Sequence, residues 1–211
     1  MNKRLAILGA GGHGKVVADA AMLSGGWSEI VFFDVGYPSK KTNGHWSIKG
    51  RDEELLASLN EFDGVVVAIG NNELRLEKTR RLLDAGANIV SIIHPSAVIS
   101  SFATIGVGSV VFSGAIVNVD AKVGMACIIN SGAVIEHDCH LGGGVHASPN
   151  ATLSGGSVVG DRSWIGASAV SKQLINIAAD VIIGAGSVVV KNIPDGVTVI
   201  GNPAIPLLKI K

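Results

Sequence analysis

The chain has few of the residues on which many globular cores and binding surfaces depend. Only 4% of its 211 residues are aromatic, with a single tyrosine, and it has two cysteines. Two cysteines provide no disulfide framework and no zinc-type spacing. Basic and acidic residues number 17 each, so the formal net charge is zero. This balance indicates no surface for nucleic acid or for an anionic membrane.

Long hydrophobic runs are also absent. Lys3 and Arg4 precede the run Leu5–Leu8, which is too short for the apolar region of a signal peptide. No segment is long enough to span a membrane, so we expect a cytoplasmic protein. The composition still includes 47% hydrophobic residues and 28 glycines. Small aliphatic side chains in a narrow, regular interior explain these values better than a conventional globular core.

The strongest pattern is a repeat of six residues. From Ile99 to Val189 every sixth residue is aliphatic at 14 of 16 positions, the exceptions being Ala147 and Ser171. The residue two before each of these is usually small and includes Cys127 and Cys139. Neither a helix nor an ordinary strand keeps such a register for ninety residues. The repeat predicts a parallel β-helix with one large and one small inward side chain per hexapeptide, and with both cysteines in its core.

Glycine adds a second period of eighteen residues, which is seen at Gly106, Gly124, Gly142 and Gly160, and again at Gly166 and Gly184. This spacing predicts three hexapeptides per coil and about five coils. We expect these glycines to occupy one corner, where the backbone needs an unusual angle. Because Ser171 replaces an inward aliphatic residue, we also expect a local irregularity at Lys172 and Gln173.

Residues 1–90 follow a different pattern. Apolar runs at Leu5–Leu8, Ile30–Phe33 and Val65–Ile69 alternate with helical patterns at 15–23, 52–59 and 72–85. Such alternation predicts a small parallel α/β domain. The β-helix would then occupy residues 91–211.

A glycine-rich fingerprint follows the first apolar run. Residues 9–14 read G-A-G-G-H-G, where glycines let phosphate oxygens approach the N–H groups of a helix N-terminus. Asp34 ends the second run, where an acid accepts a hydrogen bond from a ribose hydroxyl or a base edge. The fingerprint alone favours a dinucleotide, or else only a tight structural turn. Since the domain is half of a full dinucleotide fold, a mononucleotide-linked ligand fits better.

The loop Gly70-Asn71 follows the third run and faces the same expected ligand. Arg75 lies one turn into the next helix. It has two equally good interpretations, a ligand contact or a solvated helix face.

One segment of the repeat, residues 129–140, has charged and polar residues where the other coils have mostly small, neutral ones. Asn130, Glu136-His137-Asp138 and His140 fall outside the inward positions. An imidazole beside a carboxylate is the usual arrangement of a general base. Gly155 follows His137 by eighteen residues, one coil along and roughly 5 Å away. Its N–H could stabilise an oxyanion formed near His137.

His146 lies nine residues, or half a coil, from His137, so the two histidines fall on different faces. A site that uses both must lie between subunits. For the same reason His137, His140 and His146 diverge within one chain, and we expect no metal site. His94 and His140 are interpreted as surface residues.

Several segments of the chain resemble one family over essentially its whole length. They read LAILGAGGHGKVVADAA, GVVVAIGNN before Arg75, IHPSAVI, NSGAVIEHDC and VIIGAGSVVVKNIPDGVTVIGNPA. The chain is similar to bacterial sialic-acid O-acetyltransferases and nucleotide-activated amino-sugar N-acetyltransferases. The resemblance implies a Rossmann-like nucleotide-sugar-binding domain over 1–90. It also implies a left-handed β-helix over 91–211 that forms a homotrimer and binds acetyl-CoA between subunits.

The resemblance also implies residue roles. His137 would take a proton from the sugar amine, Asp138 would orient His137, and His146 and Gly155 would address the acetyl carbonyl. The implied substrate-binding residues are Ala10, Gly11, Gly12, His13, Asp34, Gly70, Asn71 and Asn130. The implied acetyl-CoA-binding residues are His146, Gly155, Gly166, Ala167, Ile183, Gly184, Lys191, Gly201 and Pro203. The chain departs from the family in Asn71, which is often aspartate, and in Ile205, which stands where a lysine could meet a coenzyme phosphate.

The function implied is acetyl transfer from acetyl-CoA to the 4-amino group of a UDP-, dTDP- or GDP-linked 4-amino-4,6-dideoxy sugar for surface polysaccharide or glycan synthesis. Three alternatives remain: O-acetylation of a sialic acid, a non-catalytic nucleotide-sugar sensor, and a metalloenzyme on the same prism. No nucleic acid or membrane partner is expected.

Overall fold

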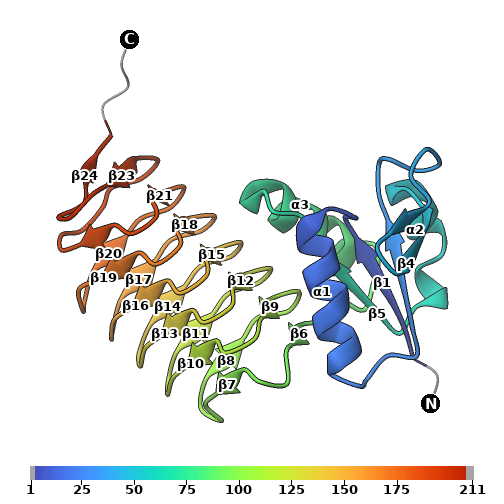
Figure 1. Ribbon diagram of the computed structural model, residues 1–211, viewed down its shortest axis with the longest axis horizontal. Helices are drawn as coiled ribbons and strands as arrows, with labels where there is room; N and C mark the ends of the chain where they lie inside the picture. The colour runs from blue at the N-terminus through green and yellow to red at the C-terminus, as the bar shows by residue number, and fades with distance from the viewer. Residues whose placement is uncertain (1–2, 208–211) are drawn as a thin grey trace. The chain divides into compact units, whose positions relative to one another are not determined.

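The computed structural model describes residues 3–207, and the chain divides into two compact units, residues 1–95 and 96–211. The first is an α/β unit and the second is a parallel β-helix (Figure 1). The fold class predicted from the repeats and the apolar runs is therefore confirmed. Among residues 3–207 no helix combines the length and the hydropathy that a membrane span requires.

The first unit is built on a five-stranded sheet in the order β3-β4-β2-β1-β5. Strands β1, β2, β4 and β5 are parallel, and β3 is an antiparallel edge strand. The elements of this unit are β1 (Arg4–Leu8), α1 (Gly12–Leu23), β2 (Glu29–Phe33), β3 (Thr42–Asn43), β4 (Trp46–Gly50), α2 (Asp52–Ala57), the 3-10 helix η1 (Leu59–Glu61), β5 (Gly64–Val67), α3 (Asn72–Asp84) and β6 (Ile92–Ile93).

The three predicted strands are the three that form continuous apolar runs. All of β5 and the last four residues of β1 are buried, as expected for parallel strands covered on both faces. Strands β3 and β4 were not predicted from the sequence. In Trp46–Gly50 only Ile48 and Gly50 are buried, so the segment has neither a long apolar run nor a regular alternation.

In the second unit, strands of two residues recur every six residues and form three parallel sheets. The first face consists of β7 (Val98–Ile99), β10 (Ile116–Val117), β13 (Val134–Ile135), β16 (Thr152–Leu153), β19 (Val170–Ser171) and β22 (Val188–Val189). The second face consists of β8 (Thr104–Ile105), β11 (Lys122–Val123), β14 (His140–Leu141), β17 (Val158–Val159) and β20 (Asn176–Ile177). The third face includes β9 (Val110–Val111), β12 (Ile128–Ile129), β15 (His146–Ala147), β18 (Trp164–Ile165), β21 (Ile182–Ile183), β23 (Thr198–Ile200) and β24 (Ile205–Pro206).

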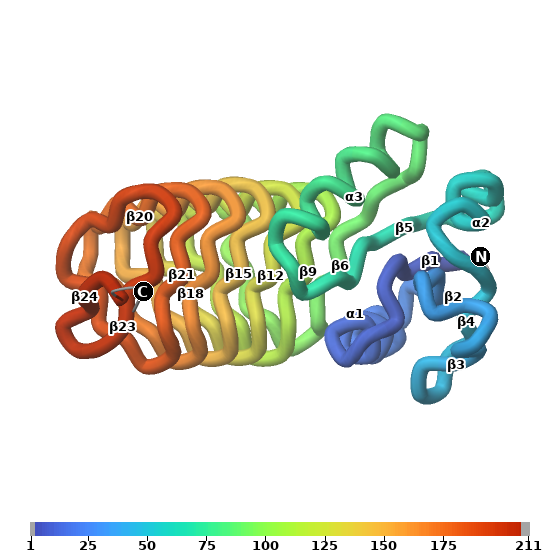
Figure 2. The backbone as a smooth tube through the Cα atoms, turned by 90° about the horizontal axis from the view of Figure 1, so that it is seen from above, coloured from blue at the N-terminus to red at the C-terminus, as the bar shows by residue number. Residues whose placement is uncertain are grey.

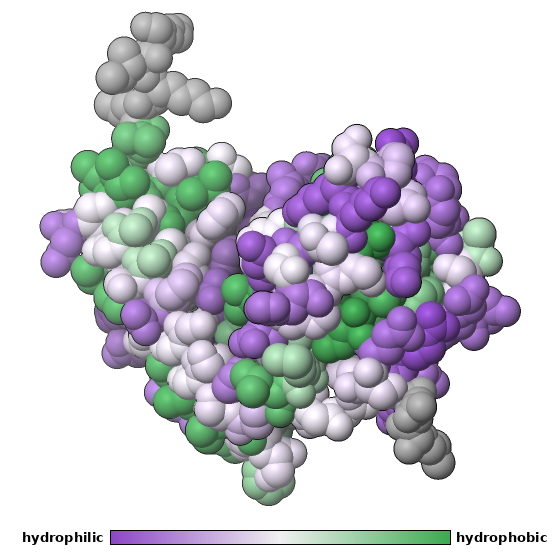
Figure 3. Space-filling model, turned by 45° about the vertical axis from the view of Figure 1, so that its right-hand side comes forward, coloured by the Kyte–Doolittle hydropathy of each residue, from purple (hydrophilic) through white to green (hydrophobic). Residues whose placement is uncertain are grey.

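Each residue of one coil pairs with the residue eighteen positions along in the next. Ile129, for example, lies opposite Val111 and Ala147. Viewed from above, successive coils follow the same path (Figure 2). The predicted inward positions form one continuous core in which both cysteines are buried. At the C-terminal end the antiparallel strand β24 closes the third face, and exposed Ile200, Ile205 and Leu207 contribute to the hydrophobic surface there (Figure 3).

The expected backbone angle of the periodic glycines is wrong. The positive-φ residues of the β-helix recur every six positions from Gly108 to Gly186 and do not include Gly106, Gly124, Gly142, Gly160, Gly166 or Gly184. Those six glycines are required by close stacking. A Cβ on Gly124 would lie 2.6 Å from the carbonyl carbon of Gly142 in the next coil.

The expected irregularity at Lys172 and Gln173 is also wrong. Strand β19 keeps its register with both neighbours. The inward hydroxyl of Ser171 is accommodated because it accepts from the N–H of Ser154 at 3.1 Å and lies 3.2 Å from Oγ of Ser157. A small hydrogen-bonded cluster therefore replaces the missing aliphatic side chain.

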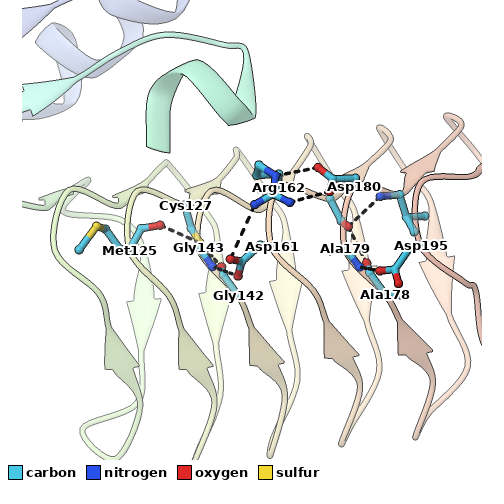
Figure 4. Close-up of polar contacts among 12 residues, drawn as sticks. Met125, Cys127, Gly142, Gly143, Asp161, Arg162, Ala178, Ala179, Asp180 and Asp195 are labelled. Carbon is cyan, nitrogen blue, oxygen red and sulfur yellow. Dashed lines mark hydrogen bonds and ion pairs between the residues drawn. The ribbon is translucent and has the colours of Figure 1, made fainter. Parts of the chain in front are cut away.

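Aspartates stabilise the corner between the second and third faces (Figure 4). Asp161 accepts from the N–H of Gly143 at 2.8 Å, and Asp195 accepts from the N–H of Ala179 at 2.8 Å. Arg162 forms two hydrogen bonds with Asp180 one coil along, at 2.7 and 2.6 Å. The two aspartate contacts satisfy turn N–H groups of a neighbouring coil, and the Arg162–Asp180 pair joins two coils through side chains.

We expect Gly124→Ala to destabilise the β-helix by about 1–3 kcal/mol, because the added methyl group meets backbone that cannot move aside. Gly186→Asn is the matched control. Gly186 has a φ of 67° and open space around its Cβ position, and Asn150 adopts a similar φ of 58° at the same corner position. Thermal unfolding of both variants tests the stacking explanation, which equal losses of stability would contradict.

Candidate functional site

The glycine-rich turn between β1 and α1 has two structural glycines and two open ones. Gly9 has a φ of 109°, and a Cβ on Gly14 would lie 2.2 Å from the carbonyl oxygen of Gly9. A Cβ on Gly11 or Gly12 would meet nothing within 4 Å. The outer glycines thus pack the helix against the strand. The inner two leave the N-terminus of α1 accessible to a phosphate group.

Asp34 holds this turn in place. Its carboxylate accepts from the N–H of Ala10 at 2.7 Å and from the N–H of Gly36 at 2.9 Å. Two residues that the sequence analysis did not single out also bind the turn. Lys40 donates to the carbonyl of Ala10, and Asn43 donates to the carbonyl of Gly11 at 3.1 Å. Lys40 lies in the irregular connection after β2 and Asn43 in the two-residue strand β3, and no spacing pointed to either.

The loop before α3 is organised by a buried arginine. Arg75 is 1% exposed and donates to the carbonyls of Ile69 and Gly70, at 2.9 and 3.2 Å, and to Oδ1 of Asn72 at 2.9 Å. Asn71 caps α3 by accepting from the N–H of Leu74 at 2.9 Å. The solvated interpretation of Arg75 is therefore wrong, because its guanidinium shapes the loop from inside.

Arg75 also affects His13. Burial, and secondarily the positive charge of Arg75, lower the pKa of His13 from 6.5 to about 4. The imidazole at the start of α1 is consequently neutral at physiological pH.

The glycine turn and the neighbouring strand ends border a cavity of about 350 Å³, which we call the sheet-end cavity. It lies at the carboxyl ends of the parallel strands, where open α/β sheets bind ligands. Its lining residues are Leu8, Gly9, Asp34, Val35, Asp52, Ile69, Leu74 and Lys78.

In the β-helix, the adjacent residues His137 and Asp138 form a hydrogen-bonded pair on the turn after β13. Nδ1 of His137 lies 2.7 Å from Oδ2 of Asp138, and both side chains are more than half exposed. This bond keeps the proton on Nδ1 and leaves the Nε2 lone pair as the basic site. The hydrogen bond to Asp138 is the main cause that raises the pKa of His137, and the charge of Glu136 adds to it.

Gly155 lies beneath the imidazole of His137, as the spacing of eighteen predicts. A Cβ built on Gly155 would lie 2.5 Å from both Cε1 and Nε2 of His137. Any side chain at position 155 would therefore displace the imidazole. The backbone also joins these two coils here, because the N–H of Gly156 donates to the carbonyl of His137 at 2.9 Å.

A second cavity, of about 540 Å³, lies on the third face of the β-helix, and we call it the third-face cavity. It brings together five of the residues expected to bind acetyl-CoA, namely His146, Gly166, Ala167, Ile183 and Gly184. The other lining residues are Ser148, Pro149, Trp164, Ile182 and Ala185. Each of these five other residues lies one or two coils, at eighteen residues per coil, from one of the five expected residues. The coil period therefore contained the signal that would have identified them.

His146 is held at the edge of this cavity by two neighbours. Its ring stacks on Trp164 with centroids 4.9 Å apart, and its Nε2 lies 3.1 Å from Nδ2 of Asn130. Because Oδ1 of Asn130 accepts from the N–H of Ser131, its amide group must donate to Nε2. His146 is then the neutral tautomer with its proton on Nδ1.

The remaining expected residues lie elsewhere. Asn130, assigned to the sugar, contacts His146 on the third face, not His137 of the same chain. Lys191, Gly201 and Pro203 are exposed near the C-terminal end and do not line the third-face cavity. Within residues 3–207, no three side chains of histidine, cysteine, aspartate or glutamate converge as a metal site would require.

Comparison with known proteins identifies relatives of the whole chain. Residues 4–82 match the PglD N-terminal domain family. GDP-perosamine N-acetyltransferase of Escherichia coli O157:H7 is 30% identical over 181 residues, which cover 83% of this chain and 80% of that protein.

Two solved structures share the complete fold. The acetyltransferase domain of PglB from Neisseria gonorrhoeae FA1090, in complex with acetyl coenzyme A, is 41% identical with a TM-score of 0.94, covering 98% of this chain and 100% of that one. PerB from Caulobacter crescentus, in complex with CoA and GDP-perosamine, is 38% identical with a TM-score of 0.90, covering 96% of both chains.

The lowered pKa of His13 predicts an acid-sensitive stability. The unfolded chain binds a proton at His13 below pH 6.5 but the folded chain only below about pH 4, so the free energy of unfolding falls as the pH falls through this range. We expect His13→Gln to remove about 3 kcal/mol of this loss. Urea unfolding between pH 7 and 4 measures it, with the exposed His45→Gln as control. Parallel pH curves for the wild type and His13→Gln would contradict the assignment.

Proposed function

Because this chain belongs to the family of nucleotide-amino-sugar N-acetyltransferases, we propose that it transfers the acetyl group of acetyl-CoA to the 4-amino group of a nucleotide-linked 4-amino-4,6-dideoxy sugar. The observation that carries the chemistry is the His137–Asp138 pair lying over Gly155. The product would serve bacterial surface polysaccharide or glycan synthesis. Acetyl-CoA supply fits a cytoplasmic location.

The proposed reaction is a direct transfer. The sugar amine attacks the thioester carbonyl carbon while Nε2 of His137 removes a proton from the amine nitrogen. The tetrahedral intermediate collapses, the carbon–sulfur bond breaks, and the proton on His137 passes to the departing thiolate. Asp138 supports this cycle, because its carboxylate stabilises the imidazolium formed at His137.

The two substrates are assigned to different units. The glycine turn with Gly11, Gly12 and His13, together with Asp34 and the Gly70-Asn71 loop, would bind the nucleotide sugar, supported by the open glycines and the sheet-end cavity. The third-face cavity would bind acetyl-CoA. Its lining of small residues and one tryptophan suits a long, flexible chain. Lys191, Gly201 and Pro203 stay assigned to the distal end of the coenzyme, and Asn130 to the sugar.

A homotrimer is part of the proposal, because His137 and the third-face cavity lie at opposite edges of the first face. His137 is on the turn from the first to the second face, whereas Ser148 and Pro149 are on the turn from the third to the first. Packing the first faces of three copies around an axis would bring the His137 edge of one copy against the cavity edge of the next. Such an arrangement would join Asn130 and His146 of one copy to His137 of the next.

The outward positions of the first face support this assembly. They are apolar on five of six strands: Val98, Ile116, Val134, Val170 and Val188, with Thr152 as the exception. The corresponding positions of the second face are mostly polar: Thr104, Lys122, His140, Val158 and Asn176. An apolar column of this kind is typical of a surface that is covered in an assembly.

O-acetylation of a sialic acid is the alternative reaction for the same base. It would need no nucleotide site. The open glycine turn and the sheet-end cavity favour the nucleotide-linked amine instead.

We expect His137→Ala to reduce acetyl transfer by two to four orders of magnitude, roughly the contribution of a general base. Gly155→Ala should reduce it by about 10²-fold through displacement of the imidazole, with the fold intact. Thiol release from acetyl-CoA, with UDP-, dTDP- and GDP-linked 4-amino-4,6-dideoxy sugars and with free sialic acid, measures both. The exposed His140→Ala is the control. Full turnover by His137→Ala would overturn its assignment, and turnover only with sialic acid would establish the alternative reaction.

We expect Val170→Asp to dissociate the trimer and abolish transfer, because it places a charge in the apolar column. Val158→Asp is the matched control on the second face, where Val158 is 44% exposed compared with 36% for Val170. Light scattering and thiol release measure the two effects. A folded, active monomer would contradict the shared site.

Mixing two inactive variants tests the shared site further. Ala167→Trp fills the third-face cavity but leaves His137 intact. After the subunits exchange with those of His137→Ala, about one site in four regains both halves. No recovery of activity would show that each chain carries its own site.

A further inference from the structure

The sheet-end cavity has three kinds of wall. Leu8, Val35, Ile69 and Leu74 form apolar walls suited to the faces of a planar ring. Gly9 places one end of the cavity at the glycine turn, where the proposed function puts the phosphates. The remaining wall carries charged side chains. Such a lining suits the base of a nucleotide, with apolar side chains for its faces and charged side chains for its edge.

Two of the charged side chains form a partly buried pair. Nζ of Lys78 donates to Oδ2 of Asp52 at 2.6 Å, and the two side chains are 21% and 13% exposed. The pair joins α3 to the start of α2. Asp34 also lines the cavity, but its two oxygens accept from the backbone of the glycine turn and of Gly36. The Asp34 carboxylate thus serves the glycine turn, whereas Asp52 lies beside an ammonium group, so that the pair offers a base edge both acceptors and a donor.

The Lys78–Asp52 pair presents one donor followed by two acceptor oxygens. Lys78 retains further N–H groups beyond the one given to Asp52, and both carboxylate oxygens can accept additional hydrogen bonds. The complementary edge is an acceptor followed by two donors. Guanine has this order, with O6, N1–H and the 2-amino group in a row. Hypoxanthine offers the acceptor and only one donor, uracil has a second acceptor in place of the second donor, and adenine and cytosine reverse the order.

We infer that the Lys78–Asp52 pair reads the base of the substrate and selects a guanine nucleotide. Lys78 donates to O6, and the carboxylate of Asp52 accepts from N1–H and the 2-amino group. This inference rests on the proposed function and narrows its substrate to GDP-linked amino sugars. The binding of GDP-perosamine by PerB agrees with it.

Binding of nucleoside diphosphates tests the inference without the amino sugar. Titration calorimetry of the wild-type protein with GDP, IDP, ADP, UDP and CDP compares bases that differ at defined edge positions. IDP differs from GDP only in lacking the 2-amino group, so we expect it to bind at least about tenfold more weakly. ADP, a purine with the reversed edge, should bind more weakly still. Equal affinities for GDP, IDP and ADP would overturn the inference.

Variants identify the residues responsible. Asp52→Asn should bring the affinity for GDP down to about that for IDP, and Lys78→Met should weaken GDP and IDP by similar factors. Arg80→Met, an exposed change on the same helix, is the control and should leave the ratios unchanged. Circular dichroism and thermal unfolding verify that each variant is folded. Folded variants that keep the wild-type preference for GDP would contradict the role of the pair.

The result separates this inference from the proposed function. If none of the diphosphates binds, the nucleotide part of the proposed function fails together with the inference. If UDP binds more tightly than GDP, and thiol release occurs with a UDP-linked amino sugar, only the inference fails.

Discussion

Coil-on-coil stacking in register is the constraint from which the rest of the β-helix follows. Each strand of two residues bonds to the strands eighteen positions away, so every residue has a fixed neighbour above and below. Glycine recurs where backbones approach too closely for a Cβ, as at Gly124 and Gly142. The same rule places Gly155 under His137 and aligns His146, Trp164 and Ile182 along one cavity. Functional groups in this fold are therefore organised in columns.

The turns contribute a second constraint, which the His137–Asp138 pair uses. A left-handed residue is needed every six positions, and Asp138 occupies one of these positions with a φ of 59°. Aspartate and asparagine tolerate this conformation better than most other residues, which explains their recurrence at Asp120, Asn150 and Asp180. Only at position 138 does a histidine precede such an aspartate. The repeat thus supplies the carboxylate, and a histidine in the preceding position supplies the imidazole of the proposed base.

The sequence predicted those features that depend on periodicity or on local spacing. The β-helix, its buried cysteines and the contact between positions 137 and 155 follow directly from intervals of six and eighteen. Features that depend on side chains arriving from distant segments could not be predicted. The sequence left Arg75 equally between a ligand contact and a solvated helix face beside Glu77 and Lys78. In the structure it is buried and donates to backbone carbonyls of the preceding loop. Lys40 reaches the glycine turn from an irregular connection, and Asn43 reaches it from the short strand β3.

For the periodic glycines, the spacing of eighteen residues is correct but the predicted reason for glycine, a positive φ, is wrong. A positive φ favours glycine and a close backbone approach requires it, so glycine spacing alone does not distinguish the two causes. Only the turn geometry distinguishes the two causes. The residue with a positive φ comes two positions after the periodic glycine, at Gly108 after Gly106 and at Gly144 after Gly142.

The filled interior of the triangular prism limits what one chain can do. Its interior is occupied by the aliphatic core, so no substrate can enter between its sheets. Side chains on different faces point away from one another, as His137 and His146 do. In the proposed trimer, the second wall of the acetyl-transfer site comes from another chain. Under the proposed trimer, the rigidity of the coils becomes an advantage, because the base and the coenzyme cavity meet in one fixed geometry at each of the interfaces without any rearrangement inside a subunit.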